Sequence, residues 1–284
     1  MQQDLLVVHG PSEPVQPLVL DSPHSGRGRP ADFGSMLDDT ALQTAEDSFV
    51  DALYLPATQR GAPLLAAQWS RVYIDANREA DDIDPELLDA PWPGGGQASF
   101  RALLGKALVW RTLDDGRPVY SRRLTVAEVQ QRIARYHAPY HARLRGLLDA
   151  SHARFGRVVH INCHSMNAVA GANGVGGAGT ARADFVLGDR HSVTCDPALT
   201  ALVRDTLAAM GYDVKVNDPF QGAALVQTFG DPAHGRHSLQ IEINKRLYMD
   251  EATQQRHAGF APLQRNLMRL IDALIERFGV PAAR

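Results

Sequence analysis

Apolar runs and helical patterns alternate along the chain, and three of the apolar runs end in short polar motifs. Residues 17–26 read PLVLDSPHSG, residues 157–166 read RVVHINCHSM, and residues 237–246 read HSLQIEINKR. Each run begins like a buried β-strand and carries a histidine or a glutamate near its end. Because ligands of open α/β sheets bind at the carboxyl ends of the strands, this pattern points to function as well as to packing.

Helical patterns occupy much of the chain between these runs. Residues 40–55 have helical spacing, and residues 125–155 form a long helical pattern that breaks or kinks near Pro139. The stretch DPALTALVRDTLAAMG has an Asp-Pro start and a glycine stop, and residues 251–278 are predicted to form a closing helix. Helices are therefore expected between most of the strands.

Two further segments resemble strands and two resemble loops. SRVYIDANR is short, β-branched and aromatic, and YDVKVND has the pattern of another strand. Residues 79–98 have the composition of a loop, and the glycine-rich residues 171–179 predict a mobile loop that would bring Arg182 to a substrate on closing. The alternation predicts an α/β fold: a mainly parallel, mixed sheet with helices on both faces, and residues 1–284 as a single domain.

Composition narrows the classes of protein. Hydrophobic residues make up 44% of the chain, charged residues 21%, and the formal net charge is −3. This charge predicts no broad basic surface for nucleic acid, so a small anionic substrate would need a local arginine cluster. No segment has the pattern of a signal peptide or a membrane-spanning helix, and two cysteines suit a reducing compartment. We therefore expect a cytoplasmic protein without a nucleic-acid or membrane partner.

The strands of the second and third motifs sort their side chains onto two faces. Since successive residues of a strand point to opposite sides, His164 shares a face with His160 and Asn162, whereas Cys163 points into the core. Glu242 lies on a polar face by the same alternation. Polar rows inside a buried strand are costly unless each group is paired or acts at a site.

The histidines of the first two motifs are candidate metal ligands. A hydrolytic zinc site uses three protein ligands and leaves one position for water, and His24 and His164 supply two imidazoles. A carboxylate on the helical pattern after the first strand is expected to be the third. Glu46, Asp47 and Asp51 are the candidates, and spacing alone does not choose among them.

Hydrolysis also requires a proton acceptor and positive charge. Glu242 suits the role of general base, although it could instead be a buried ion-pair partner of Arg246 or Lys245. Either Arg71 or Arg78 could stabilise a developing oxyanion. The pair Asn77–Arg78 is suited to binding a substrate carboxylate, because the guanidinium fork matches two carboxylate oxygens.

Some of these residues also have structural interpretations. Arg78 could pair with Asp75 or Asp81 rather than with a substrate. His137 and His141 are spaced like zinc ligands on a helix, but no glutamate follows His137 and a proline lies between the two histidines. A kinked structural helix is the better interpretation of that segment.

Seven segments together resemble the N-formylglutamate amidohydrolase (deformylase) family. They span residues 20–251 in the family's order and read SPHSG, EDSFVDALY, SRVYIDANR, CHSM, ADFVLGDRHSVTCDP, GDPAHG and QIEINKRLYMDE. The order His, acidic ligand, Asn-Arg, His, Glu is also similar to that of zinc carboxypeptidases and aspartoacylase. The resemblance implies a zinc-exopeptidase (phosphorylase/hydrolase)-like fold, His24, Asp47 and His164 as ligands of Zn²⁺, and Glu242 as general base.

The resemblance also implies a reaction. It is the hydrolysis of an N-formyl amino acid, first of all N-formyl-L-glutamate, to L-glutamate and formate in histidine degradation, with Zn²⁺ or another divalent transition metal. Two positions depart from the family pattern: Gln227 lies where some members have arginine, and Lys245 lies where arginine is usual. A related zinc amidohydrolase or carboxypeptidase with another N-acyl or peptide substrate is the first alternative. A non-catalytic metal-binding homologue is the second.

Overall fold

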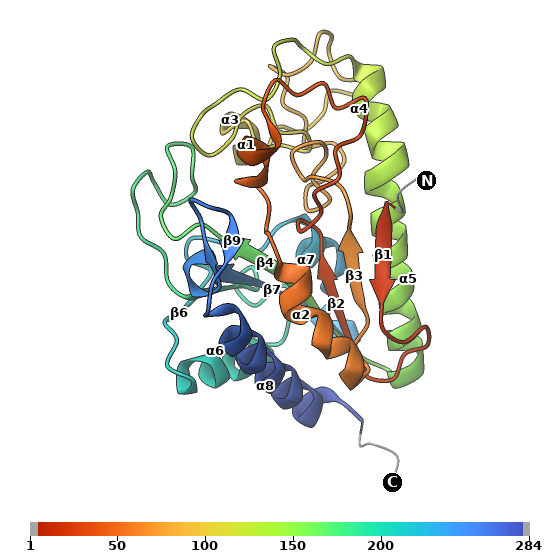
Figure 1. Cartoon of the computed structure of the whole chain (residues 1–284). Helices are drawn as coiled ribbons and strands as arrows, with labels where there is room; N and C mark the ends of the chain where they lie inside the picture. Colours follow the sequence, from red (N-terminus) through yellow and green to blue (C-terminus); the bar gives the residue numbers. More distant parts are fainter. Residues whose placement is uncertain (1–4, 281–284) are drawn as a thin grey trace.

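Seven strands form one mixed sheet in residues 5–280, the part of the chain that the computed structural model describes. The strands are β1 (Leu6–His9), β2 (Leu18–Ser22), β3 (Leu64–Ala67), β4 (Val158–Met166), β5 (Phe185–Gly188), β6 (Val214–Val216) and β7 (Arg236–Asn244). In the order β1-β3-β2-β4-β7-β5-β6, the β1–β3 and β7–β5 pairs are antiparallel and the other neighbours are parallel. The predicted mainly parallel, mixed sheet is confirmed (Figure 1).

Helices cover both faces of this sheet. They are α1 (Asp39–Gln43), α2 (Val50–Tyr54), α3 (Phe100–Leu103), α4 (Val126–Arg132), α5 (Ala138–Phe155), α6 (Pro197–Ala209), α7 (Ala224–Phe229) and α8 (Phe260–Phe278). Shorter turns are the 3-10 segments η1 (Leu55–Arg60), η3 (Pro232–His234) and η4 (Lys245–Leu247) and the π turn η2 (Ile133–His137). Helices α2, α6 and α8 pack on one face, and α4, α5 and α7 contribute to the core of the other (Figure 1).

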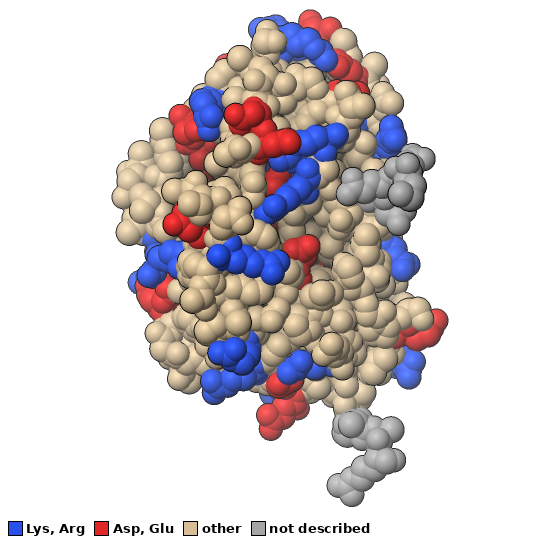
Figure 2. All heavy atoms as spheres, in the orientation of Figure 1, with Lys and Arg blue, Asp and Glu red and all other residues tan. Residues whose placement is uncertain are grey.

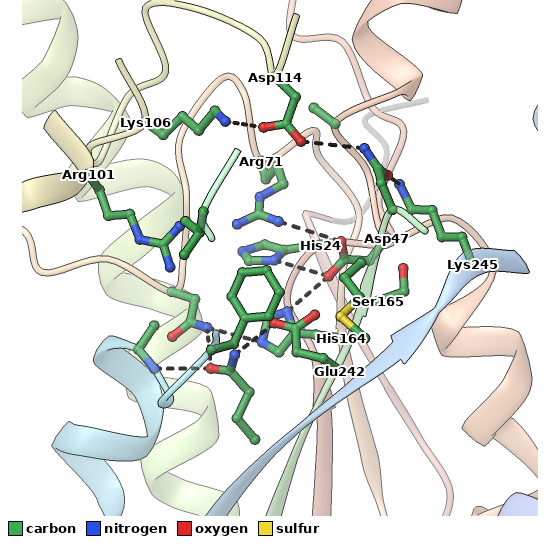
Figure 3. Close-up of a pocket in the computed structure, with 18 of the residues that line it drawn as sticks. His24, Asp47, Arg71, Arg101, Lys106, Asp114, His164, Ser165, Glu242 and Lys245 are labelled. Carbon is green, nitrogen blue, oxygen red and sulfur yellow. Dashed lines mark hydrogen bonds and ion pairs between the residues drawn. The ribbon is translucent and has the colours of Figure 1, made fainter. Parts of the chain in front are cut away.

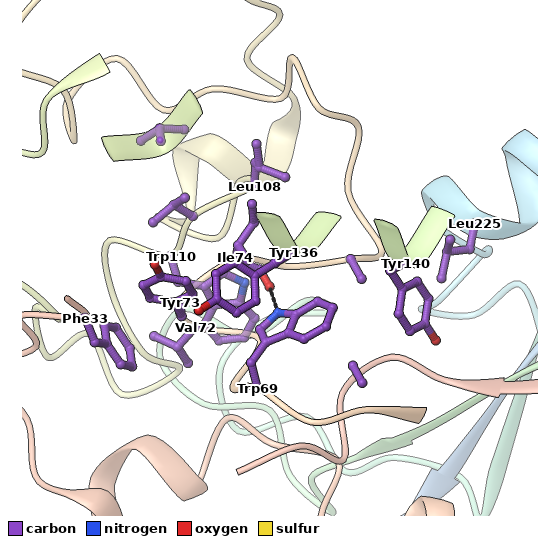
Figure 4. Packing of buried hydrophobic residues seen from close by; sticks show 14 of the residues in the cluster. Phe33, Trp69, Val72, Tyr73, Ile74, Leu108, Trp110, Tyr136, Tyr140 and Leu225 are labelled. Carbon is purple, nitrogen blue, oxygen red and sulfur yellow. Dashed lines mark hydrogen bonds between the residues drawn. The ribbon is translucent and has the colours of Figure 1, made fainter. Parts of the chain in front are cut away.

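The alternation along the strands divides the core into two clusters. Leu239 and Ile241 of β7 point toward α2, α6 and α8 and belong to one apolar cluster. The second cluster contains many aromatic side chains, and Figure 4 shows Trp69 packed beside Tyr136. The indole N–H of Trp69 donates to the carbonyl of Ile74 over 2.8 Å, so burial of this ring leaves no unsatisfied donor.

The long helical pattern at residues 125–155 forms one continuous rod with a π turn in it. Helix α4 passes through η2 into α5, and the N–H of Ala138 bonds the carbonyl of Ile133. Pro139 has no N–H, and its ring would collide with the carbonyl four residues earlier in a regular α-helix. A wider turn immediately before the proline accommodates the ring, so the helix has a π turn near Pro139 rather than the predicted break.

Three segments differ from the expected elements. Residues 40–55 form two short helices, α1 and α2, with a turn between them. SRVYIDANR is a buried irregular segment after β3, where the N–H of Asp75 bonds Leu108 and that of Trp110 bonds Val72. The closing helix begins at Phe260, since the residues before it form the hairpin of β8 (Met249–Asp250) and β9 (Gln255–Arg256).

Charges are mixed on the visible surface. On the face shown in Figure 2, lysine and arginine side chains alternate with aspartate and glutamate, without a broad patch of one sign. None of the helices in residues 5–280 combines the length and apolar character needed to cross a bilayer. Both cysteines, Cys163 and Cys195, are buried free thiols.

The packing of α8 gives a testable prediction of stability. Leu267 is fully buried in the core, so Leu267→Ala should lower the free energy of unfolding by about 2–5 kcal/mol through the cavity it leaves. Urea denaturation of the metal-free protein measures this change. Leu103→Ala is the control, because that side chain is 79% exposed and its loss should change the free energy by less than about 0.5 kcal/mol. Equal losses in the two variants would contradict the described packing.

Candidate metal centre and its pocket

Three neighbouring strands bring the polar motifs together. β2, β4 and β7 are adjacent and parallel, so their carboxyl ends lie at the same edge of the sheet. His164 lies directly opposite Glu242 in the register of β4 and β7, and His24 follows β2 by two residues. Gly26 then passes so close to the end of β3 that a Cβ there would lie 2.5 Å from the backbone of Gln68. The SPHSG motif therefore needs glycine at this position.

Asp47 lies in the turn between α1 and α2. Its N–H donates to the carbonyl of His24 over 3.0 Å, and the Ser25 hydroxyl donates to the carbonyl of Asp47 over 3.0 Å. Phe49 has a left-handed backbone with φ +67°, which turns the chain into α2. The first motif therefore supplies one candidate ligand and also positions the next.

His24, Asp47 and His164 form a compact buried cluster. Each offers one ligand atom, and these atoms lie within 4.8 Å of one another. Asp47 Oδ2 lies 2.9 Å from Nδ1 of His164 and 3.3 Å from Nδ1 of His24 (Figure 3). Two imidazoles and a carboxylate are the type of donor set that binds Zn²⁺ and other divalent transition metals.

The outer nitrogen of each imidazole is already engaged. Nε2 of His24 lies 2.6 Å from Oδ1 of Asp75, and Nε2 of His164 lies 2.8 Å from Oδ1 of Asn162. Nδ1 of His24 is buried and lacks a hydrogen bond within residues 5–280, since its contact with Asp47 does not have hydrogen-bond geometry. Both Nδ1 atoms thus face the centre of the cluster, as metal-binding histidines do when a carboxylate or amide orients them from behind. The residues fit a divalent metal.

Charge around the cluster favours ionised carboxylates. Burial alone would raise the pKa of Asp47, but the hydrogen bond with His164 and the close contacts with His24 and Arg71 hold it below its usual range. Burial would likewise raise the pKa of Asp75, and Arg71 and His24 lower it well below its usual range. Both groups are therefore available as anions, which metal ligation and imidazole orientation require.

The other carboxylates of the EDSFVD segment lie elsewhere. Glu46 is buried and pairs with Arg29 over 2.7 Å, and burial raises its pKa to about 7. Asp51 lines a separate surface hollow with Arg256. Of the three candidates for the third ligand, the structure brings Asp47 to the histidines.

Glu242 faces the same pocket. Its side chain is 7% exposed, and Oε1 accepts a hydrogen bond from Gln240 over 2.8 Å. Burial raises the pKa of the Glu242 carboxyl above its usual range. A carboxylate whose proton affinity is raised in this way is a more effective proton acceptor near neutral pH.

Arg71 lies in the middle of the pocket, beside the cluster (Figure 3). Its guanidinium donates to Oδ2 of Asp75 over 2.8 Å and lies 3.5 Å from Oδ1 of Asp47. The guanidinium of Arg71 also stacks on the ring of Trp110, and the indole N–H of Trp110 points toward Asp75. These contacts fix the guanidinium in one orientation toward the pocket.

Asn77 and Arg78 also line the pocket. The Asn77 amide nitrogen lies 3.0 Å from Nε2 of His164, and its oxygen accepts from the N–H of Leu225 over 2.9 Å. Arg78 donates to the carbonyls of Asn77 and Lys106, over 2.7 and 3.1 Å. Its Nη2 lies 3.9 Å from Oδ2 of Asp75, so the alternative ion pair with that residue is a long one.

Several other candidates are also placed. His137 and His141 bond the backbone carbonyls of Arg78 and Ala76 and lie outside the cluster, in agreement with a structural helix. Lys245 and Arg182 line the pocket. Gln227 does not line it, and faces a neighbouring hollow instead.

Four charged residues of the site were not predicted from the sequence. Asp75 supports His24 and Arg71, and Arg101, Lys106 and Asp114 line the pocket (Figure 3). Asp75 belongs to the SRVYIDANR motif, so its proximity to Arg78 was a usable signal. Arg101 lies on the four-residue helix α3, and Lys106 and Asp114 lie in irregular segments, so no periodicity indicates which of these side chains turn inward.

The fold and the cluster define the protein first as a mixed α/β protein with a candidate one-metal centre at the carboxyl edge of its sheet. A family model described as N-formylglutamate amidohydrolase matches residues 16–249. The chain therefore belongs to the N-formylglutamate amidohydrolase family, which confirms the resemblance read from the motifs.

Individual relatives agree with this assignment. The chain is 30% identical to N-formylglutamate deformylase of Pseudomonas aeruginosa over 265 residues, covering 91% of this chain and 92% of the relative. It is 44% identical to N-formylglutamate amidohydrolase of Ralstonia eutropha, whose crystal structure superposes with a TM-score of 0.88 over 96% of this chain and 98% of that one. A gene product of Agrobacterium tumefaciens, 18% identical over 96% of each chain with a TM-score of 0.69, shares the fold.

The contact between Asp75 and His24 gives a prediction for metal affinity. Asp75→Asn removes the charge that orients and polarises the imidazole, and should weaken metal binding about 10- to 100-fold. Competition with a chromogenic chelator measures the affinity, and circular dichroism checks the fold. Asp205→Asn is the control, because its side chain is 67% exposed and far from these contacts in the sequence. Unchanged affinity in Asp75→Asn would mean that this carboxylate does not support the metal centre.

Proposed function

We propose that this protein hydrolyses N-formyl-L-glutamate to L-glutamate and formate, with one divalent metal held by His24, Asp47 and His164. The observation that carries the proposal is the buried His–Asp–His cluster beside Glu242, in a chain of the N-formylglutamate amidohydrolase family. Relatives named N-formylglutamate deformylase support the substrate. Zn²⁺ is the first choice of metal, because nitrogen and oxygen ligands with an open position are typical of hydrolytic zinc sites. In the cell, this reaction would release glutamate during histidine degradation.

Glu242 would act beside the metal in the activation of water. When bound, the metal would lower the pKa of a water molecule and polarise the formyl carbonyl. Glu242 would accept a proton from the attacking water and deliver it to the leaving amine. Its buried position and raised pKa suit both steps, since a carboxyl group must gain and lose a proton within one turnover.

Arginines would supply the remaining charge. Arg71 would donate to the oxyanion that develops on the formyl oxygen, since Asp75 and Asp47 already hold its guanidinium in place beside the cluster. Asn77 and Arg78 would bind the α-carboxylate of the substrate and so orient the small acyl group. The contact of Asn77 with His164 would link that binding to the orientation of a metal ligand.

The proposed location is the cytoplasm. Its reducing conditions suit the free thiols of Cys163 and Cys195, both of which are buried.

Metal removal tests the proposal directly. We expect one equivalent of metal per chain, and formate release from N-formylglutamate that a chelator abolishes and Zn²⁺ restores. The same preparation is offered N-formylaspartate, N-acetylglutamate and a short peptide. Reconstitution with Mn²⁺, Co²⁺ and Ni²⁺ ranks the metals by the rate of formate release that each supports.

The other outcomes separate the parts of the proposal. Chelator-sensitive activity on another member of the panel would retain the metal centre and discard N-formylglutamate as substrate. Bound metal without activity on any member would indicate a non-catalytic homologue. Absence of both metal and activity would overturn the assignment of the cluster.

The role of Glu242 has its own test. Glu242→Gln keeps the shape of the side chain but removes its proton affinity, so kcat should fall by about 10²- to 10⁴-fold while the metal stays bound. Steady-state formate release and metal analysis on the same sample measure both effects. Glu276→Gln on the exposed side of α8 is the matched control and should retain full activity. Full activity in Glu242→Gln would refute its role as general base.

A further inference from the structure

The pocket beside the cluster contains more cations than carboxylates. Three carboxylates line it, from Asp47, Asp114 and Glu242. Six cationic side chains line it: Arg71, Arg78, Arg101, Lys106, Arg182 and Lys245. A divalent metal would add to this excess. The pocket is therefore suited to a ligand with more than one negative charge.

Two of these cations are paired with carboxylates, and a third donates to backbone carbonyls. Arg71 is paired with Asp75, with 2.8 Å between Nη2 and Oδ2. Lys106 is paired with Asp114. Arg78 donates to two backbone carbonyls, which leaves only part of its guanidinium for a ligand.

Two more cations have neutral acceptors. Arg182 donates to the carbonyls of Asn167 and Val175, each over 3.2 Å. The ammonium of Lys245 donates to the Asn167 side chain over 2.8 Å and lies 3.3 Å from the carbonyl of Thr44. These contacts hold both cations against the wall of the pocket.

Arg101 differs from the other five. Within residues 5–280 its guanidinium has no hydrogen bond or ion pair, and its Cζ lies over the ring of Phe220, 6.0 Å from the ring centroid. Burial lowers its pKa to about 9, and the like charges of Arg78 and Arg71 add to that effect. A half-buried cation without a partner is unfavourable, so a ligand that supplies negative charge at this point would be stabilised.

The backbone of Arg101 is held firmly in this position. Ser99 caps α3 by accepting from the N–H of Arg101 over 3.0 Å. Both the N–H and the hydroxyl of Ser99 donate to the carboxylate of Asp82 over 2.8 Å. The N–H of Lys106 bonds the carbonyl of Arg101 over 2.9 Å. These contacts fix the backbone at Arg101, and the guanidinium extends from it into the lining of the pocket.

We propose that Arg101 binds the side-chain carboxylate of the acylated amino acid and thereby selects dicarboxylic substrates. The inference rests on the proposed function, in which Asn77 and Arg78 take the α-carboxylate. Arg101 reaches into the pocket from the side opposite Lys245, so it offers a second anchor point (Figure 3). Its planar fork, with all of its donors available, matches two carboxylate oxygens.

Substitution of Arg101 tests this assignment with a matched pair of substrates. N-formylglutamate and N-formylglutamine have nearly the same shape and differ in the charge of the side chain. Arg101→Met keeps an unbranched apolar side chain and should lower kcat/KM for N-formylglutamate roughly 10- to 100-fold, because a charge-assisted bidentate contact is lost. For N-formylglutamine we expect a change of less than about 3-fold, since a neutral amide forms the weaker hydrogen bond. Arg101→Lys should restore part of the selectivity.

Two further variants serve as controls. Arg204→Met, at an exposed position on α6, should leave kcat/KM for both substrates unchanged. Arg78→Met should lower both alike, because both substrates carry an α-carboxylate. Metal content is measured in each variant, so that loss of metal is not mistaken for loss of substrate binding.

The outcomes distinguish this inference from the proposed function. Suppose that the wild-type protein hydrolyses N-formylglutamate. If Arg101→Met then lowers activity equally on both substrates, or leaves both activities unchanged, the role of Arg101 is overturned and the proposed function stands. If the wild-type protein hydrolyses neither, the proposed function fails. Calorimetric binding of glutamate and glutamine then tests Arg101 alone: weaker binding of glutamate only in Arg101→Met supports the inference, and equal binding overturns it.

Discussion

The candidate site depends on the parallel alignment of β2, β4 and β7. Adjacent parallel strands end at one edge of a sheet, so groups carried on three distant parts of the chain meet there without a dedicated linker. His164 and Glu242 are register partners, and His24 leaves the edge of the next strand. Asp47 is then fixed by a hydrogen bond to the carbonyl of His24. Loss of the alignment would separate every one of these groups.

A second level of organisation comes from one buried carboxylate. Asp75 contacts Nε2 of His24, the guanidinium of Arg71, the indole of Trp110 and the N–H of Asn77. A fully buried anion is tolerable because these donors satisfy it. The same contacts orient a candidate metal ligand and a candidate oxyanion-stabilising group at once. The electrostatics of the site therefore depend on residues behind the pocket as much as on those that line it.

Much of the fold and of the site could be predicted where the sequence has a regular hydrophobic period or a recognisable motif. Strand alternation placed His164 on the polar face and Cys163 in the core, as the structure has them. The prediction of a strand at SRVYIDANR is wrong, because β-branched and aromatic residues also suit a buried irregular segment that pairs with another loop.

Other parts depend on long-range contacts that local patterns do not report. Asp47 lies in a turn, so helical spacing could not choose it, and the family resemblance was needed. Arg101 lies on a four-residue helix reached by an irregular segment. Nothing local indicates that its side chain turns inward beside Arg71 and Arg78.

The register of β4 against β7 also limits how this chain can change over evolution. Loops around the pocket can lengthen or shorten while the sheet remains, but insertion of one residue within β4 would reverse the side-chain direction of every later position in that strand. The Cys163 thiol would then enter the pocket, and the imidazole of His164 would turn into the apolar cluster packed against α2, α6 and α8. New substrates are thus accessible through altered loops, whereas the spacing within these strands must be inherited intact.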